Sequence, residues 1–328
     1  MGSHMEEVLK FARRSVLAAA VAGAVAAAAP VQAQEPLSVV ATTGMVADAA
    51  RAVGGDLVEV RALMGPGVDP HAYRQTRTDI LALTQADLVL WNGLYLEAQL
   101  EEFLLELGER QKVVAVAEAV PDELRVGHDD YADRFDPHVW MDPDLWAHVV
   151  GAVADALALT HPEGEETFRA NEAAHLAEIA RLSAYSDEVL GTIPERARVL
   201  LTAHDAFNYF GAAYGFEVVG IQGISTESEA GLNRIAELVD LLVERGIGAV
   251  FVESSVSDRN IRALAEGAAA RGHEVRIGGE LYSDAMGEPG TYEGTYIGMI
   301  DHNVTTIAAA LGGQVPERGM DGRLTAGF

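Results

Sequence analysis

The sequence of 328 residues contains no cysteine. That absence excludes disulfide bonds, thiolate metal sites and thiol nucleophiles. It also excludes the attachment of a lipid to a cysteine at the start of a processed chain, so we expect a protein that is not lipid-anchored. A metal site in this chain would have to use imidazole and carboxylate ligands.

Lysine is almost as scarce, since only Lys10 and Lys112 occur. Fifty acidic residues stand against 23 lysines and arginines, which gives a formal net charge of −27 at pH 7. Such a surface repels the phosphates of nucleic acid and the headgroups of anionic lipid. We therefore expect no nucleic-acid partner.

Long apolar stretches are limited to an alanine-rich segment over residues 15–29, which is too short to span a bilayer comfortably. Three cationic residues precede it, and a small-x-small pattern at Val31-Gln32-Ala33 follows it. This combination is typical of a secretory signal peptide. We therefore predict export to the periplasm. The cationic residues are Lys10, Arg13 and Arg14.

From Leu37 onward, apolar runs alternate with amphipathic helical patterns. This alternation predicts an α/β fold in which helices flank mainly parallel sheets. We expect two lobes with a four-stranded sheet in each. The expected strands are 39–43, 58–63, 87–91 and 113–117 in the first lobe and 199–202, 218–221, 249–252 and 274–277 in the second. The expected helices are 45–53, 77–85, 95–110, 143–159, 206–214, 232–245, 258–271 and 293–311, and residues 127–136 are expected to form an acidic loop.

Residues 163–190 differ from the segments around them, because they lack a strand pattern and are polar on most sides. They predict one helix of roughly 40 Å at 1.5 Å per residue. We interpret it as a strut between the lobes; the alternative is a helix packed within one domain. The predicted organisation is a tag remnant (1–5), a signal peptide (6–33), an N-terminal lobe (34–162), a connecting helix (163–193), a C-terminal lobe (194–312) and a loosely held tail (313–328).

Two Asp-Pro-His sequences, ending at His71 and His138, lie in loops after strands of the first lobe. In the second lobe, His204 and Asp284 each follow a predicted strand. Ligands of open parallel sheets bind beyond the carboxyl ends of the strands, so these four side chains can face one cleft. Imidazole and carboxylate suit zinc, manganese or iron. The alternative for each histidine is an ordinary solvated side chain.

The remaining histidines are expected to be structural or surface residues. His148, His175 and His302 fall inside predicted helices, and His161 and His273 lie at helix ends, where a histidine can favour the helix dipole. His128, in the acidic loop, is a candidate collector of metal ions.

Five motifs together resemble the helical-backbone solute-binding proteins of metal importers of the ABC type (cluster A-I, TroA-like). The resemblance covers nearly all of the chain after the signal peptide. It implies two lobes joined by a long helix, a metal ion buried between them, and His71, His138, His204 and Asp284 as its ligands. The motifs are Gly65-Pro66-Gly67-Val68-Asp69-Pro70-His71, Asp136-Pro137-His138-Val139-Trp140-Met141-Asp142-Pro143, Thr202-Ala203-His204-Asp205-Ala206-Phe207-Asn208-Tyr209-Phe210, Val252-Glu253-Ser254-Ser255 and Tyr282-Ser283-Asp284-Ala285-Met286-Gly287.

The expected function is therefore capture of one divalent ion by a monomeric protein and its delivery to a membrane permease. Three imidazoles and a carboxylate favour zinc over manganese. Against zinc, members dedicated to that metal often carry a long histidine-rich loop, which residues 127–136 do not provide. Two other functions remain open, a binding protein for a larger metal chelate and a zinc hydrolase.

Overall fold

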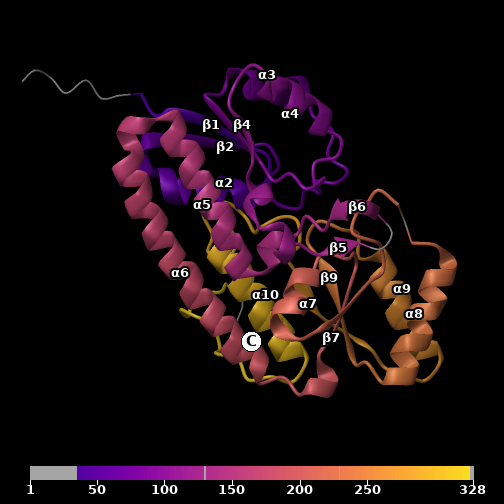
Figure 1. Ribbon diagram of the computed structural model, residues 1–328. Helices are drawn as coiled ribbons and strands as arrows, with labels where there is room; N and C mark the ends of the chain where they lie inside the picture. The colour runs from indigo at the N-terminus through magenta and orange to yellow at the C-terminus, as the bar shows by residue number, and fades with distance from the viewer. Residues whose placement is uncertain (1–34, 129–130, 229, 326–328) are drawn as a thin grey trace, which may run out of the picture. The chain divides into compact units, whose positions relative to one another are not determined.

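The structure is a computed structural model that describes residues 35–128, 131–228 and 230–325. The predicted tag remnant and signal peptide lie outside these residues. Residues 36–328 form one unit. Within its described part, helices and strands alternate as the sequence predicts, and we use N-terminal lobe for the elements from β1 to α5 and C-terminal lobe for those from β7 to α10 (Figure 1).

The sheet of the N-terminal lobe has four parallel strands in the order β2-β1-β3-β4. Its central strands are buried over Val39–Ala41 of β1 and over the whole of β3, Leu88–Trp91. That burial explains the apolar sequences of these segments, because helices cover both faces of a parallel sheet. The strands are β1 (Leu37–Ala41), β2 (Val58–Ala62), β3 (Leu88–Trp91) and β4 (Val113–Ala115).

Side-chain caps fix the starts of several helices in this lobe. Thr76 and Asp79 form a reciprocal capping box on α3, and Asp142 caps α5, whose first residue is Pro143. The helix predicted over 95–110 begins only at Glu101, because Leu94 and Tyr95 have positive φ angles of 53° and 69°. The helices are α2 (Gly44–Gly54), α3 (Arg77–Gln85), α4 (Glu101–Gly108) and α5 (Pro143–Thr160).

The acidic segment predicted as a loop instead contains a short antiparallel hairpin, β5 (Gly127–His128) and β6 (Tyr131–Phe135). Just before it, the backbone N–H of Val126 donates to the hydroxyl of Tyr209 in the C-terminal lobe, at 3.1 Å. The segment thereby connects the two lobes. Short 3₁₀ turns lie at Gly55–Leu57, Val116–Ala119, Asp122–Leu124, Val139–Met141, Pro162–Gly164 and Glu195–Ala197.

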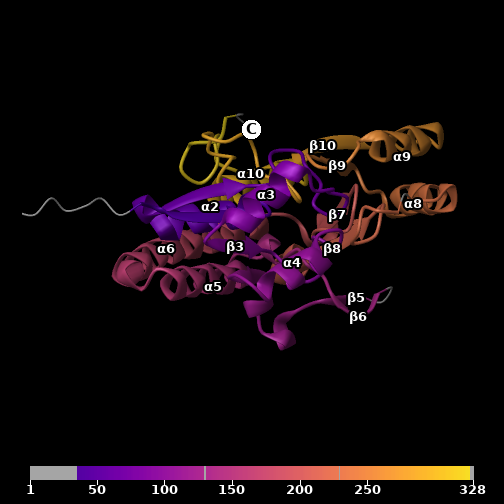
Figure 2. The ribbon, with the colours of Figure 1, turned by 90° about the horizontal axis from the view of Figure 1, so that it is seen from above.

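The long helix α6 (Glu165–Gly191) runs beside α5 in both views (Figures 1 and 2). It contacts α2 and α5 of the N-terminal lobe and α7 and α10 of the C-terminal lobe, so it connects the lobes as predicted. Although most of its surface is polar, it buries Phe168, Ile179 and Leu182 in the shared core.

The C-terminal lobe has the four predicted strands, but among the described residues they do not form the single four-stranded sheet that was expected. They form two parallel hydrogen-bonded pairs, β7 with β8 and β9 with β10. Helices α8 and α9 lie side by side on its outer part (Figures 1 and 2). The strands are β7 (Val199–Thr202), β8 (Glu217–Gly220), β9 (Ala249–Glu253) and β10 (Arg276–Leu281), and the helices are α7 (Asn208–Tyr214), α8 (Leu232–Arg245), α9 (Arg259–Ala270) and α10 (Tyr296–Ala310).

The largest hydrophobic core extends through both lobes and includes Val39, Phe207 and Ile307. At its centre, Tyr296 stacks on Trp146 of α5, and its hydroxyl donates to the backbone oxygen of Trp140 at 2.9 Å. Smaller cores lie at the outer end of each lobe. The lobes therefore share buried apolar surface and are not separate bodies on a flexible joint.

The C-terminal tail packs more firmly than expected over residues 313–325. Leu324 is fully buried, and the N–H of Met320 donates to the carboxylate of Asp301 at 3.0 Å. Arg181 of α6 also pairs with Asp321 at 3.0 Å. The prediction of a loosely held tail is wrong for these residues. Among the described helices, none is both long and apolar enough to cross a membrane.

Candidate metal centre

The fold brings the four predicted ligands together between the lobes. His204 follows β7 by two residues, and Asp284 follows β10 by three. His71 comes from the loop after β2, and His138 from the segment after the hairpin. One donor atom from each of the four lies within 4.8 Å of all the others, and every one of these side chains is buried.

The donor atoms have the spacing that an ion would require. The two Nε2 atoms of His71 and His138 are 3.2 Å apart, while Asp284 lies 3.4 Å from His138 Nε2 and 3.2 Å from His204 Nε2. Ligands at about 2.0–2.1 Å from a tetrahedral zinc ion are roughly 3.3 Å from one another. The donors therefore surround a point that one transition-metal ion fits.

Two of the donor atoms make no hydrogen bond and have only ion-pair contacts with other members of the cluster. Neither His204 Nε2 nor Asp284 Oδ1 accepts or donates a hydrogen bond within the described residues, although both atoms are buried. A buried polar atom without a partner costs about 1–3 kcal/mol. A cation at this point would satisfy both atoms.

Two buried carboxylates orient the imidazoles of His138 and His204 by binding Nδ1, the ring nitrogen that faces away from the other donors. Asp136 lies 2.6 Å from His138 Nδ1, and Glu253 lies 2.5 Å from His204 Nδ1. Each carboxylate accepts the Nδ1 proton, so Nε2 is the ring atom that faces the other donors and would bind an ion. The sequence motifs contain both acids, but only the folded chain reveals this role, because Glu253 is far from His204 in the sequence.

The two Asp-Pro-His segments share one local geometry. In each, the aspartate Oδ1 accepts the backbone N–H of the histidine two residues later, at 2.9 Å from Asp69 to His71 and at 2.9 Å from Asp136 to His138. The proline between them has no N–H of its own to satisfy. The repeated motif is therefore a device that holds a histidine at a fixed point on a loop.

The charges in this cluster shift the pKa values of its members. Burial acts to lower the pKa of His138, but the carboxylates of Asp136 and Asp284 outweigh it and raise the pKa to about 9. Burial lowers the pKa of His71 to about 3, assisted by the other two imidazoles. Although burial alone would raise the pKa of Asp284, His204 and His138 hold it well below its usual range. Asp284 is therefore an anion available to a cation.

A buried glutamate supports the loop around His138. The carboxylate of Glu97 accepts hydrogen bonds from the hydroxyl of Thr42 at 2.6 Å and from the backbone N–H groups of Asn92 at 2.8 Å and Gly93 at 3.1 Å. The side chain of Asn92 in turn donates to the backbone oxygen of Pro137 at 3.2 Å. This network joins the end of β3 to the second Asp-Pro-His segment.

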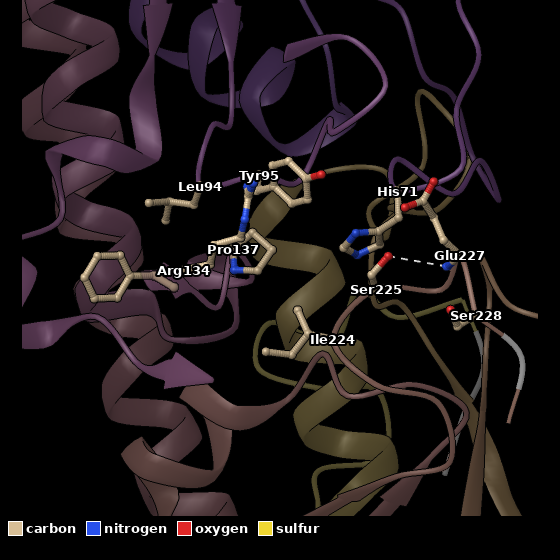
Figure 3. Close-up of a pocket in the computed structure, with 10 residues that line it drawn as sticks. His71, Leu94, Tyr95, Arg134, Pro137, Ile224, Ser225, Glu227 and Ser228 are labelled. Carbon is tan, nitrogen blue, oxygen red and sulfur yellow. Dashed lines mark hydrogen bonds between the residues drawn. The ribbon is translucent and has the colours of Figure 1, made fainter. Parts of the chain in front are cut away.

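Cavities reach the cluster from two sides. One, of about 190 Å³, is lined by His71 together with Tyr95, Arg134 and Ser225 (Figure 3). Another, of about 560 Å³, is lined by Asp284 and by residues on both sides of it. His138 and His204 are fully buried and line neither cavity.

Comparisons with known proteins agree with the geometry. A family model described as zinc-uptake complex component A periplasmic matches residues 39–310. The manganese-binding lipoprotein MntA of Bacillus subtilis (strain 168) is 49% identical over 85% of this chain and 91% of that protein. The zinc-binding protein TroA of Treponema pallidum (strain Nichols) is 46% identical over 83% of this chain and 88% of that protein. Its solved structure superposes with a TM-score of 0.82 over 84% of this chain and 99% of that chain.

The chain belongs to the zinc-uptake component A family. The resemblance drawn from the motifs is thus confirmed, as is the fold of two lobes joined by a long helix. This membership does not by itself identify the metal, because one relative is named for manganese and another for zinc.

The other histidines whose side chains the structure describes lie apart from the cluster. Among the described residues, His71, His138, His204 and Asp284 are the one group of such side chains close enough to share an ion. His175 is buried in α6, as a packing residue would be, and His273 Nε2 lies 2.8 Å from the backbone oxygen of Ile247. The side chain of His128 lies outside the described residues.

Proposed function

We propose that this protein captures one divalent transition-metal ion between its lobes and delivers it to the permease of an ABC importer. The observation that carries the proposal is the buried group of three imidazoles and one carboxylate, whose donor atoms lie within 4.8 Å of one another. The family membership supports the same function. The ion is the transported cargo, so the protein binds and releases it without changing it.

We propose zinc as the preferred ion and manganese as the second candidate. Three imidazoles suit zinc better than the harder manganese ion. Calorimetric titration of metal-free protein with each ion at the same pH tests this preference. Tighter binding of manganese would reverse it.

We propose that His71, His138, His204 and Asp284 supply the ligands. Replacing His204 with alanine removes one of four donors and should abolish most zinc affinity while the fold remains. His148 is exposed on α5 and provides the matched control. Unchanged affinity in His204→Ala would remove this residue from the site.

We further propose a monomer that is exported to the periplasm without a lipid anchor. The relative MntA is named a lipoprotein, whereas this sequence contains no cysteine to carry a lipid. Cell fractionation tests the location, and light scattering of the purified protein tests the oligomeric state. Detergent-dependent release from membranes would contradict the absence of an anchor.

The cavity beside His71 favours a second candidate, the capture of a metal together with a small chelator. Elemental analysis combined with native mass spectrometry separates the two, because a chelate adds the mass of its organic part. A hydrolase would need an open position on the metal for water, whereas the proposed set supplies four protein ligands. A hydrolase screen of zinc-loaded protein tests that reading.

A further inference from the structure

His71 is held less firmly than the other two imidazoles. The rings of His138 and His204 are each fixed by a carboxylate at Nδ1, but within the described residues no carboxylate hydrogen-bonds to the ring of His71. His71 is also the histidine of the cluster that lines a cavity. An ion that leaves the site on this side would have to pass His71.

A loop of the C-terminal lobe, residues 222–228, covers this cavity. Ile224 and Ser225 form part of the cavity wall, and in Figure 3 the hydroxyl of Ser225 accepts the backbone N–H of Glu227, at 3.3 Å. The loop is braced internally, since Gln222 Nε2 donates to the backbone oxygen of Ser228 at 3.1 Å. Its first two residues are joined to the rest of the C-terminal lobe, because the N–H of Gln222 donates to the backbone oxygen of Ala203 at 3.0 Å and the N–H of Asp205 donates to that of Gly223 at 3.3 Å. A movement of the loop would therefore turn about these two residues.

Two side-chain hydrogen bonds attach this loop to the N-terminal lobe. The hydroxyl of Thr226 donates to Asp69 Oδ2 at 2.5 Å, and Gln99 Nε2 donates to Glu227 Oε1 at 2.6 Å. The bond to Glu227 is exposed to solvent, so it contributes less than the partly buried bond to Asp69.

Asp69 links the loop to the ligand directly. Its Oδ1 holds the backbone N–H of His71, while its Oδ2 holds Thr226. The corresponding acid, Asp136, differs because it also fixes the ring of His138. Movement of loop 222–228 away from the N-terminal lobe would thus release the carboxylate that positions His71.

The opposite wall of the cavity, formed by the turn at residues 93–95, is fixed by several contacts. Gly93, Leu94 and Tyr95 have consecutive positive φ angles of 82°, 53° and 69°, and Glu97 binds the N–H groups at the start of this turn. The guanidinium of Arg134 lies over the ring of Tyr95, 3.2 Å from its centroid. A strained backbone persists only where its surroundings hold it. Of the two walls, loop 222–228 is therefore the one that we expect to open, because its far part is held across the cavity by the two side-chain hydrogen bonds to Asp69 and Gln99.

We propose that residues 222–228 form a lid over His71 and that the Asp69–Thr226 hydrogen bond is the latch that sets the rate of ion exchange. The proposal rests on the proposed metal-binding function. Asp69 and Thr226 act as positioning residues, since neither belongs to the proposed ligand set. Breaking the latch lowers the barrier for entry and for exit alike, so the two rates change together.

Thr226→Val removes the hydroxyl and keeps the side-chain shape, and Thr226→Ser retains the hydroxyl. In stopped-flow measurements of zinc binding and of zinc release to a chelator, we expect Thr226→Val to accelerate both steps roughly tenfold or more. The dissociation constant should change less than about threefold, because both rates rise. Thr226→Ser should behave like the unmodified protein.

Thr305→Val is the matched control. Thr305 is a buried threonine whose hydroxyl donates to the carboxylate of Asp301 at 3.1 Å, in α10 and outside both cavity walls. It should lower the unfolding temperature without accelerating exchange. Gln99→Ala, which removes the other attachment of the lid, should accelerate exchange in the same direction as Thr226→Val.

Unchanged exchange rates in a folded, zinc-binding Thr226→Val protein would overturn the lid. Faster exchange in Arg323→Ala but not in Thr226→Val would also overturn the lid, because Arg323 lines the cavity on the Asp284 side. If Thr226→Val bound zinc more weakly with an unchanged association rate, Thr226 would have a purely structural role. That result would also overturn the proposed lid. Failure of the unmodified protein to bind zinc or manganese would instead contradict the proposed function.

Discussion

At the scale of single residues, the candidate site depends as much on the acids behind the imidazoles as on the donors themselves. Asp136 and Glu253 are completely or almost completely buried, and each holds the Nδ1 side of one histidine. Partners of this kind fix the tautomer and the ring orientation of a ligand. They are therefore the most informative positions to change without removing a donor.

Glu253→Gln should weaken zinc binding by roughly 10- to 100-fold, because the amide no longer carries the charge that supports His204 as a ligand. Competition with a chromophoric chelator measures the change. Glu274→Gln, an exposed position before β10, is the control. Unaltered zinc affinity in Glu253→Gln would show that His204 does not need a charged partner at Nδ1.

Metal affinity should rise with pH. Asp136 and Asp284 raise the pKa of His138 to about 9, so at pH 7 the metal-free protein holds a proton that the ion must displace. Affinity should therefore fall as pH drops below about 9 and should level off above that value. Calorimetry in buffers of different ionisation enthalpy should detect release of about one proton or more per ion at pH 7. Binding without proton release would contradict this charge state.

At the scale of elements, the sequence predicted the bounds of helices whose start or end is marked by a capping residue. Helices α3 and α8 have the predicted bounds, and the capping box of Thr76 and Asp79 marks the start of α3. The start of α4 was missed because nothing in the sequence marks Leu94 and Tyr95 as residues with positive φ. The hairpin β5–β6 was missed because its strands are short and polar.

At the candidate site, too, some features could be predicted from the sequence and others could not. The four proposed ligands could be chosen from motifs, since each lies in a recognisable loop. Two contacts could not be predicted in this way. Glu253 and His204 are far apart in the sequence of the C-terminal lobe, and Thr226 and Asp69 belong to different lobes.

Asp79→Asn should destabilise the protein by about 1–2 kcal/mol at pH 7. Burial acts to raise the pKa of Asp79, but hydrogen bonds from Thr76 and Tyr73 outweigh it and lower the pKa. A lowered folded pKa gives stability that is complete above the unfolded value of about 3.9 and is lost as pH falls through the folded value. Urea unfolding of both proteins at pH 7 and pH 3 checks this, since the difference between them should shrink at the lower pH. A constant difference would exclude the carboxylate as its source.

At the scale of the whole molecule, binding an ion between the lobes should stabilise the folded protein. Zinc at 100 times its dissociation constant adds about 2.7 kcal/mol, which should raise the unfolding temperature by about 5 °C or more. Differential scanning calorimetry measures the shift. His204→Ala should show little of it at the same zinc concentration, and an equal shift in that variant would point to binding elsewhere.

Large domain closure is not expected on binding, because α6 contacts helices of both lobes and one core extends through them. Small-angle X-ray scattering of metal-free and zinc-loaded protein should give nearly the same radius of gyration. A marked decrease on loading would show that the lobes swing apart when the ion is absent.

The apolar interior that both lobes share has a consequence for dissecting this protein. Cutting the chain before α6 would strip Trp146 and its neighbours of the partners supplied by α10. Either half, produced alone, should therefore aggregate or stay unfolded, whereas the two halves synthesised together should reassemble.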